Sequence, residues 1–447
     1  MKTTIIRLVL LVLWFGSAGA AVAQPMTPPS TKELASSPIV ASTTKAPDKR
    51  ITEYTLSPEL HRKAHRLSRI HFGEHVTGAV YGIFLLWLIL RRRWSIKFRE
   101  WAEAASRRRI VQAIIFTPLL VLTLVVLQLP LDVLSEAVEK SYGISVQSWA
   151  SWIGDWAKLQ GIVIVIGALM VWILYAVIRY SPRRWWLVFW FVALPIFTFI
   201  FFVEPFVIDP MFNHYEPLTV KAPQLVPELQ RVTRRAGMEV PPERMFWMEA
   251  SNKTIVTNAY VTGFGASKRV VIWDTSLAQE TTDGILFMFG HEMGHYVLGH
   301  IWKAMIFTSV MAFLLLYLSY RTIGRLLALR GAAWGIRSLD DWASLPALLL
   351  LASVFGFVAT VAGNTFSRYQ ENQADIYGLE ITHGIIAEPG QAGAISFQKY
   401  GETAFVDPDP NPVSVLLFFD HPTVADRVRL FATYDPWGEG RNPQFVK

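Results

Sequence analysis

The stretch Phe287–Ala304, FMFGHEMGHYVLGHIWKA, places histidines and a glutamate inside a run that is otherwise apolar. Its centre fits the pattern His-Glu-x-x-His, and on a helix His291 and His295 lie one turn apart on the same face. This spacing lets both imidazoles bind one Zn²⁺ ion, while Glu292 can reach a water at the open coordination position. Because a five-residue pattern also occurs by chance, the alternative is a helix face whose histidines are satisfied by hydrogen bonds.

A catalytic zinc needs a third protein ligand, and the absence of cysteine restricts it to His, Asp or Glu. The segment SRYQENQADIYG, residues 367–378, offers Glu371 and Asp375, which share one helix face. We expect Glu371 to bind the metal and Asp375 to accept a hydrogen bond from a ligand imidazole. An exposed acidic helix face is the alternative. His300 lies five residues beyond His295 and falls on a different helix face, so we expect a helix-end histidine rather than a ligand.

The segment DHPTVADRV, residues 420–428, is a further candidate for the site. His421 and Arg427 are suited to holding the negative charge that develops on a tetrahedral intermediate. Taken alone, the same segment is typical of a helix that begins after an aspartate N-cap and a proline, so a purely structural role is the alternative.

Residues 251–277 predict two strands joined by a glycine-containing turn at 263–267. An exposed strand edge here can pair with an extended peptide substrate. A structural hairpin that packs under the zinc helix is an equally acceptable interpretation.

Composition indicates a polytopic membrane protein, because 52% of the 447 residues are hydrophobic, only 17% are charged and the mean hydropathy is +0.32. Most of six apolar runs approach the roughly 20 residues needed to cross a bilayer. These runs are residues 76–90, 110–129, 159–178, 185–204, 303–320 and 345–363. We therefore expect an all-α polytopic membrane protein with a small α+β zincin-like catalytic domain.

The expected organisation of the chain follows from these runs. The N-terminus has a basic start, a short apolar core and the small-x-small sequence at 21–23, which predicts a signal peptide or, alternatively, an uncleaved first transmembrane helix. The predicted units are 1–23 (signal peptide or first helix), 24–75 (linker and N-terminal extramembrane segment), 76–204 (four transmembrane helices), 205–302 (zinc motif and β-hairpin), 303–363 (two transmembrane helices) and 364–447 (C-terminal part of the catalytic domain).

The charged loops predict the orientation. Arginine-rich segments at 91–109, 179–184 and 321–337 fall on one side if the helices alternate, and positive loops face the cytoplasm. We therefore expect an integral protein of a bacterial inner membrane with its catalytic domain on the extracytoplasmic side. The net charge of +7 is explained by the same clusters, so we expect the lipid bilayer and no nucleic acid as a partner.

Taken together, these motifs resemble those of the type-1 CAAX prenyl proteases, integral-membrane zinc endopeptidases that include the a-factor-converting enzyme. The resemblance runs from about residue 53 to 429. The segments that carry it are EYTLSPELHRKAHRLSRIHF, PFVIDPMFNHYEPL, NAYVTGF, KRVVIWDTSL, HEMGHYVLGH, SRYQENQAD and HPTVADR. It implies a barrel of membrane helices around a water-filled chamber, with the metal site at one end.

The resemblance also implies roles for individual residues and a substrate class. One Zn²⁺ per chain would be bound by His291, His295 and Glu371, with Glu292 as the general base. His421 and Arg427 would steady the oxyanion or the substrate backbone, and the peptide-binding edge would be lined by Asn258, Ala259 and Tyr260.

The implied substrate is a peptide or protein, which in this family can be lipidated. The expected extracytoplasmic site differs from that of the eukaryotic members and leaves quality control of membrane or envelope proteins as an alternative. A transporter or channel with a structural zinc is the alternative from another class, and the oligomeric state is not specified.

Overall fold

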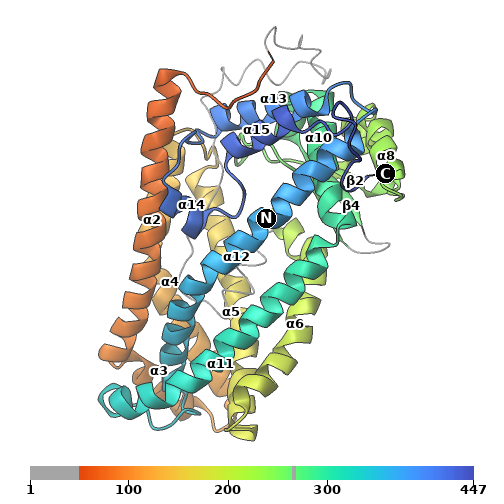
Figure 1. Cartoon of the computed structure of the whole chain (residues 1–447). Helices are drawn as coiled ribbons and strands as arrows, with labels where there is room; N and C mark the ends of the chain where they lie inside the picture. The colour runs from red at the N-terminus through yellow and green to blue at the C-terminus, as the bar shows by residue number, and fades with distance from the viewer. Residues whose placement is uncertain (1–49, 264–267, 447) are drawn as a thin grey trace.

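The computed structural model describes residues 50–263 and 268–446 (Figure 1). The predicted signal segment 1–23 and most of the predicted linker lie outside the described residues. The long helices are α2 (Pro58–Arg91), α4 (Arg109–Ser141), α5 (Trp149–Tyr180), α6 (Trp185–Val207), α11 (His300–Trp334) and α12 (Leu345–Thr382). The shorter helices are α3 (Trp94–Ala105), α7 (Leu218–Lys221), α8 (Leu225–Arg235), α9 (Asp274–Gln279), α10 (Thr282–Val297), α13 (Pro389–Thr403), α14 (Pro412–Phe418) and α15 (Val424–Thr433). The strands are β1 (Tyr215–Pro217), β2 (Met245–Met248), β3 (Ala259–Thr262) and β4 (Arg269–Trp273).

Among the described residues, six helices are long and apolar enough to cross a membrane, and each contains one of the six apolar runs found in the sequence. The expected fold class is confirmed. The first of these helices extends much further than its apolar run at 76–90, because α2 begins at Pro58, directly after the N-cap Ser57. The second half of the expected extramembrane segment 24–75 is therefore largely continuous with a membrane-competent helix.

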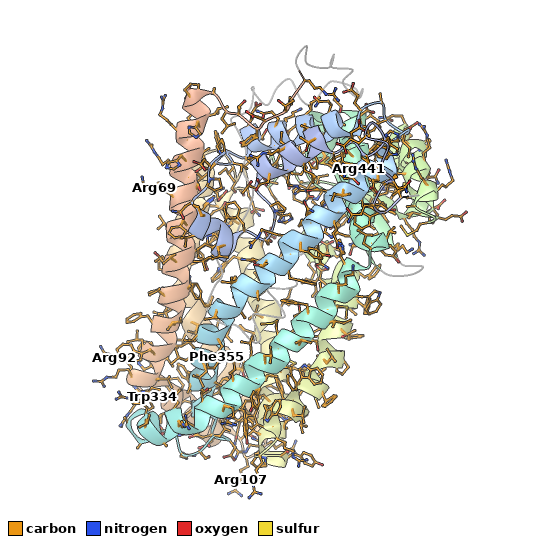
Figure 2. All side chains as sticks on the ribbon, viewed as in Figure 1. Arg69, Arg92, Arg107, Trp334, Phe355 and Arg441 are labelled. Atoms are coloured by element: carbon orange, nitrogen blue, oxygen red, sulfur yellow. The ribbon has the colours of Figure 1, made fainter. Side chains whose placement is uncertain are left out.

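The long helices form one bundle, and the sheet gathers with α8, α10, α13 and α15 at one end of it, whereas the short helix α3 lies at the opposite end (Figure 1). The opposite end carries the loops between the long helices. Figure 2 shows Arg92, Arg107 and Trp334 at that end, away from Arg441 at the end that carries the sheet. The three arginine-rich segments therefore lie at one end of the bundle, as the alternation of helices predicts.

The sheet has four strands in the order β1-β2-β4-β3. Strands β3 and β4 pair antiparallel, which confirms the two strands predicted from residues 251–277; part of the turn between them lies outside the described residues. Strands β1 and β2 have only three and four residues and were not predicted, because such short runs carry little periodicity. Strand β3 forms one edge of the sheet and packs on α10.

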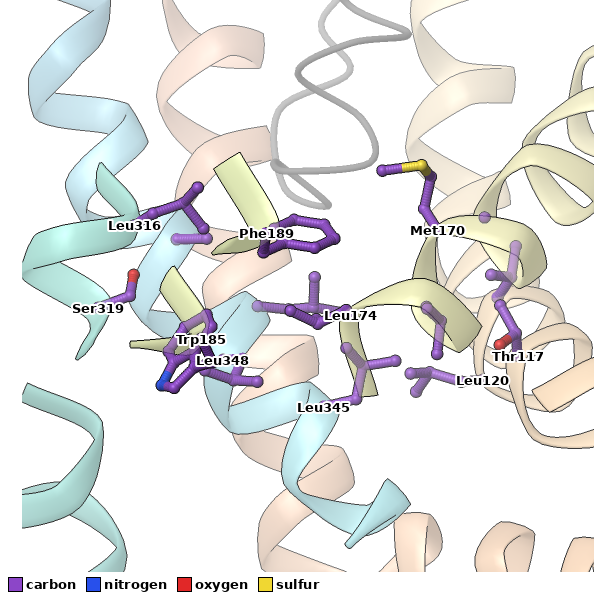
Figure 3. Close-up of a pocket in the computed structure, with 15 residues that line it drawn as sticks. Thr117, Leu120, Met170, Leu174, Trp185, Phe189, Leu316, Ser319, Leu345 and Leu348 are labelled. Carbon is purple, nitrogen blue, oxygen red and sulfur yellow. The ribbon is translucent and has the colours of Figure 1, made fainter. Parts of the chain in front are cut away.

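A cavity of about 400 Å³ lies between α6, α11 and the end of the molecule that carries the sheet. We refer to it as the chamber. Strand β3 borders it at one end, together with Glu292, Glu371 and His421. Phe189 and Leu316 line the chamber and also a smaller pocket of about 60 Å³, whose lining is almost wholly apolar (Figure 3). The chamber thus connects the candidate site with the interior of the helix bundle.

Candidate active site

Helix α10 carries the His-Glu-x-x-His motif and packs closely on α12. It begins after Thr281, whose hydroxyl accepts a hydrogen bond from the Gly284 amide at 3.0 Å. A Cβ atom at Gly290 would lie 2.9 Å from the side chains of Ile381 and Thr382 of α12. A Cβ atom at Gly294 would lie 3.0 Å from the Tyr377 side chain. These glycines let the two helices approach, and that approach brings residues 291–295 against 371–375.

Two imidazoles and one carboxylate meet at this contact. His291, His295 and Glu371 are all buried, and one potential ligand atom from each lies within 4.8 Å of the others. The His291 Nε2 atom is 3.2 Å from Glu371 Oε2, and the His295 Nε2 atom is 3.3 Å from Glu371 Oε1. The two Nε2 atoms are 3.1 Å apart. The structure therefore brings together the three ligands expected from sequence.

This donor set fits a metal ion. Glu371 Oε2 is buried without a hydrogen bond, although an imidazole nitrogen lies next to it. Two imidazole nitrogens and a carboxylate oxygen that face one point are the ligands of a catalytic zinc with its fourth position open. An ion shared by the three groups would satisfy all of these atoms at once.

His291 is supported by charged groups. Its Nδ1 atom is 2.8 Å from Asp375 Oδ1, which places Asp375 where the sequence predicted it. The Arg427 guanidinium donates a hydrogen bond to the same Asp375 oxygen and lies over the Phe397 ring at 4.1 Å. Burial lowers the pKa of His291, but the neighbouring Asp375 and Glu371 carboxylates outweigh this effect, so the pKa is raised.

Arg427 occupies a different place from the one expected. It is buried behind His291 and Asp375 and is not among the residues that line the chamber. Its contacts favour a role in holding Asp375 and, through it, His291, rather than direct contact with an oxyanion.

His421 faces the chamber beside the metal ligands. Its Nε2 atom is 3.4 Å from Glu371 Oε1, and its Nδ1 atom is 2.8 Å from Asp420 Oδ1. Half of its side chain is exposed to the chamber. Burial lowers the pKa of His421, but the Glu371 and Asp420 carboxylates outweigh this effect and raise it to about 9. The ring can therefore carry positive charge at the chamber wall, beside Glu371.

Glu292 also opens on the chamber. Its Oε1 atom is 4.0 Å from His291 Nε2, and it lines the cavity together with His295 and Glu371. The Glu292 carboxylate thus lies at the chamber wall, beside the cluster of His291, His295 and Glu371.

The edge strand β3 presents its backbone to the same chamber, which residues 258–263 line. Asn258 faces Trp273 and accepts a hydrogen bond from its amide at 3.1 Å. Because pairs alternate in an antiparallel ladder, the backbone groups of Ala259 and Val261 point away from β4 and toward the open edge. The Tyr260 side chain is buried on another face, where its hydroxyl is 3.0 Å from that of Tyr215.

His300 makes a contact that the sequence does not predict. The expected place of this residue at a helix end is confirmed, because α10 stops at Val297 and α11 begins at His300. The unexpected feature is that the Nδ1 atom of His300 lies 3.1 Å from His295 Nδ1. The only available signal was Gly299, a residue that often marks a helix end and a change in chain direction.

Comparison with known proteins agrees with this geometry. Residues 220–433 match the model of peptidase family M48, and residues 39–214 match the model described as CAAX prenyl protease N-terminal, five membrane helices. The uncharacterized metalloprotease YhfN of Bacillus subtilis is 36% identical over 347 residues, which cover 77% of this chain and 79% of that protein. The chain belongs to peptidase family M48.

More distant members and a solved structure extend the comparison. CAAX prenyl protease 1 of Saccharomyces cerevisiae is 26% identical over 61% of this chain and 62% of that protein. The crystal structure of S. mikatae Ste24p matches with a TM-score of 0.73 at 20% identity, covering 88% of this chain and 93% of that one. This M48 protein is thus a membrane metalloprotease with the Ste24p fold.

Proposed function

We propose that this M48 protein is a zinc endopeptidase that hydrolyses peptide bonds inside the chamber. The observation that carries the proposal is the convergence of His291, His295 and Glu371 at the chamber wall, with Glu292 beside them. The position next to the three ligands is open to the cavity, as a hydrolytic site requires.

Each residue of the site has a role in this proposal. Bound Zn²⁺ would lower the pKa of a water to about 7 and polarise the scissile carbonyl. The Glu292 carboxylate accepts the proton of the attacking water and later passes it to the leaving amine. The His421 side chain places an N–H donor next to the developing negative charge. Asp375 accepts the Nδ1 proton of His291 and holds that ring in orientation, while Arg427 holds Asp375.

The substrate would bind as an added strand on β3. The outward-facing backbone groups of Ala259 and Val261 supply the hydrogen bonds, and the segment 258–260 forms the wall nearest the peptide. The backbone N–H of Asn258 contributes little to peptide binding, because it already donates to the Ser276 hydroxyl at 2.8 Å. Hydrogen bonds between main chains do not depend on the side chains of the substrate. The rest of the chamber would therefore determine which side chains are accepted.

The test is Glu292→Gln, measured with a fluorogenic peptide and by metal analysis of the purified protein. We expect the variant to retain about one zinc per chain and to lose cleavage, because an amide cannot accept the proton. Glu388→Gln is the matched control, since Glu388 is exposed and forms a surface ion pair with Arg50. Cleavage by Glu292→Gln at the rate of the control would refute the assignment of the base.

The substrate class is a separate question. Relatives named CAAX prenyl protease 1 favour a prenylated peptide, whereas the expected extracytoplasmic site favours membrane or envelope proteins. We expect a reporter fused after the last residue to be extracytoplasmic and unmodified envelope peptides to be cleaved. A cytoplasmic reporter together with cleavage restricted to prenylated peptides would reverse this choice.

A further inference from the structure

The break between α10 and α11 places a third histidine beside His295, one of the proposed metal ligands. Gly299 adopts φ +68°, a left-handed conformation that turns the chain sharply between the two helices. Because of this turn, His300, the first residue of α11, lies next to His295. The two ring centroids are 5.1 Å apart in an edge-to-face arrangement. His300 is only 2% exposed.

Hydrogen bonds on both sides fix this histidine. Its Nδ1 atom is 3.1 Å from His295 Nδ1, and its Nε2 atom is 3.2 Å from Gln373 Oε1 of α12. The amide nitrogen of Gln373 donates to the Tyr369 hydroxyl at 3.2 Å, which turns the amide oxygen toward His300. The Gln370 side chain also donates to the His300 carbonyl at 3.2 Å.

One arrangement of protons satisfies this whole chain of contacts. If His295 uses Nε2 for the metal, its Nδ1 must carry the proton, and His300 Nδ1 must accept it. The proton of His300 then lies on Nε2, where the Gln373 oxygen accepts it. The chain of contacts therefore specifies the tautomer in which His295 directs a lone pair at the metal.

We infer that His300 is a positioning residue for His295, which it holds in the metal-binding tautomer and ring orientation through a neutral hydrogen-bonded chain ending at Gln373. The inference rests on the proposed metal site. Outer partners of ligand histidines are usually carboxylates, backbone carbonyls or waters. In this site a second imidazole takes that role, and its own proton is placed by an amide on α12.

The test compares the zinc affinities of His300→Phe, His300→Gln and Gln373→Leu by competition with a chromogenic chelator. Loss of an outer partner typically lowers metal affinity by about 10–100-fold, and we expect His300→Phe to fall in that range. His300→Gln retains a carbonyl acceptor and should recover part of the loss, whereas Gln373→Leu should show a smaller loss. We also expect the visible spectrum of the Co²⁺-substituted protein to change in His300→Phe, which a purely structural role would not require.

Two further variants separate the possible outcomes. His383→Phe is the matched control, because His383 stacks on Trp437 away from the site. His291→Ala should abolish zinc binding. If it does not, the proposed metal site is wrong. If it does, but His300→Phe keeps zinc affinity within twofold of the parent and an unchanged Co²⁺ spectrum, the role of His300 alone is refuted.

Discussion

The two histidines of the zinc motif lie one helical turn apart but are held by opposite kinds of chemistry. His291 rests on a buried ion pair, Asp375 with Arg427, whose side chains are 0% and 7% exposed. His295 rests on a neutral chain that leads through His300 to Gln373. The first support joins α10 to α12 and α15, and the second joins α10 to α11 and α12.

The difference has an energetic consequence. A buried ion pair is costly to form and still more costly to break, because the remaining charge is left without a partner in a low-dielectric interior. Replacing one partner of a neutral hydrogen bond lowers the free energy of unfolding by much less. Damage to the His291 support should therefore unfold the catalytic part, whereas damage to the His295 support should affect mainly the metal.

The largest expected effect is that of Asp375→Ala. It leaves the Arg427 guanidinium buried without its partner, which should lower the free energy of unfolding by about 3–5 kcal/mol. It also frees the His291 ring, so zinc affinity should fall. Denaturant unfolding in detergent micelles and zinc titration measure the two effects. Asp340→Asn, in an exposed loop, is the control, and equal stability of the two variants would contradict the importance of the ion pair.

A double variant, Asp375→Leu with Arg427→Met, sharpens the comparison. Removing both charges leaves no unpaired group, so stability should return to within about 1–2 kcal/mol of the parent protein, since well-packed apolar replacements of buried pairs are often neutral. Zinc affinity should remain low, because His291 still lacks its acceptor. Recovery of zinc affinity in the double variant would show that His291 does not need this support.

A substitution at Gly299 tests the support of His295, the other histidine of the motif. Gly299→Val places a β-branched residue at φ +68°, which costs about 1–2 kcal/mol, and should shift His300 away from His295. Gly237→Val is a matched control, because Gly237 also has φ +68° and, as at Gly299, an added Cβ would meet no atom within 4 Å. Both variants should lose similar thermal stability, but only Gly299→Val should lose zinc affinity. A loss of affinity in both would mean that strain anywhere in the catalytic part weakens the site.

The smallest effect concerns a buried carboxylate that lacks a direct arginine partner. Burial raises the pKa of Glu280, although the Ser396 hydroxyl donates to it at 2.9 Å and Lys399 partly offsets the shift. A raised pKa in the folded state means that stability present at low pH is lost as the pH rises through that pKa. Glu280→Gln should therefore raise the midpoint of thermal unfolding at pH 8 by no more than about 2–4 °C and leave it unchanged near pH 4. An equal rise at both pH values would contradict the linkage.

Much of the molecule follows from local patterns. The six membrane-competent helices are visible as apolar runs because crossing the hydrocarbon core requires about 20 predominantly apolar side chains. The strands β3 and β4 are visible from their β-branched residues. The helix α2 begins at Pro58, well before its apolar run. Its first half is polar, so hydropathy does not predict it, and packing against other helices stabilises it. The strands β1 and β2 are too short to show an alternating pattern that would predict them.

The sequence by itself determined the class of protein, the two imidazoles on one turn and the two carboxylates one turn apart, because helical spacing is a local property. Only the tertiary structure decided that Glu371 meets those imidazoles, that Arg427 turns to Asp375 instead of the chamber, and that His300 returns to His295. These contacts depend on how closely α10 approaches α12 and on a reversal at Gly299. Both are consequences of packing between segments that are distant in the chain or separated by a helix break.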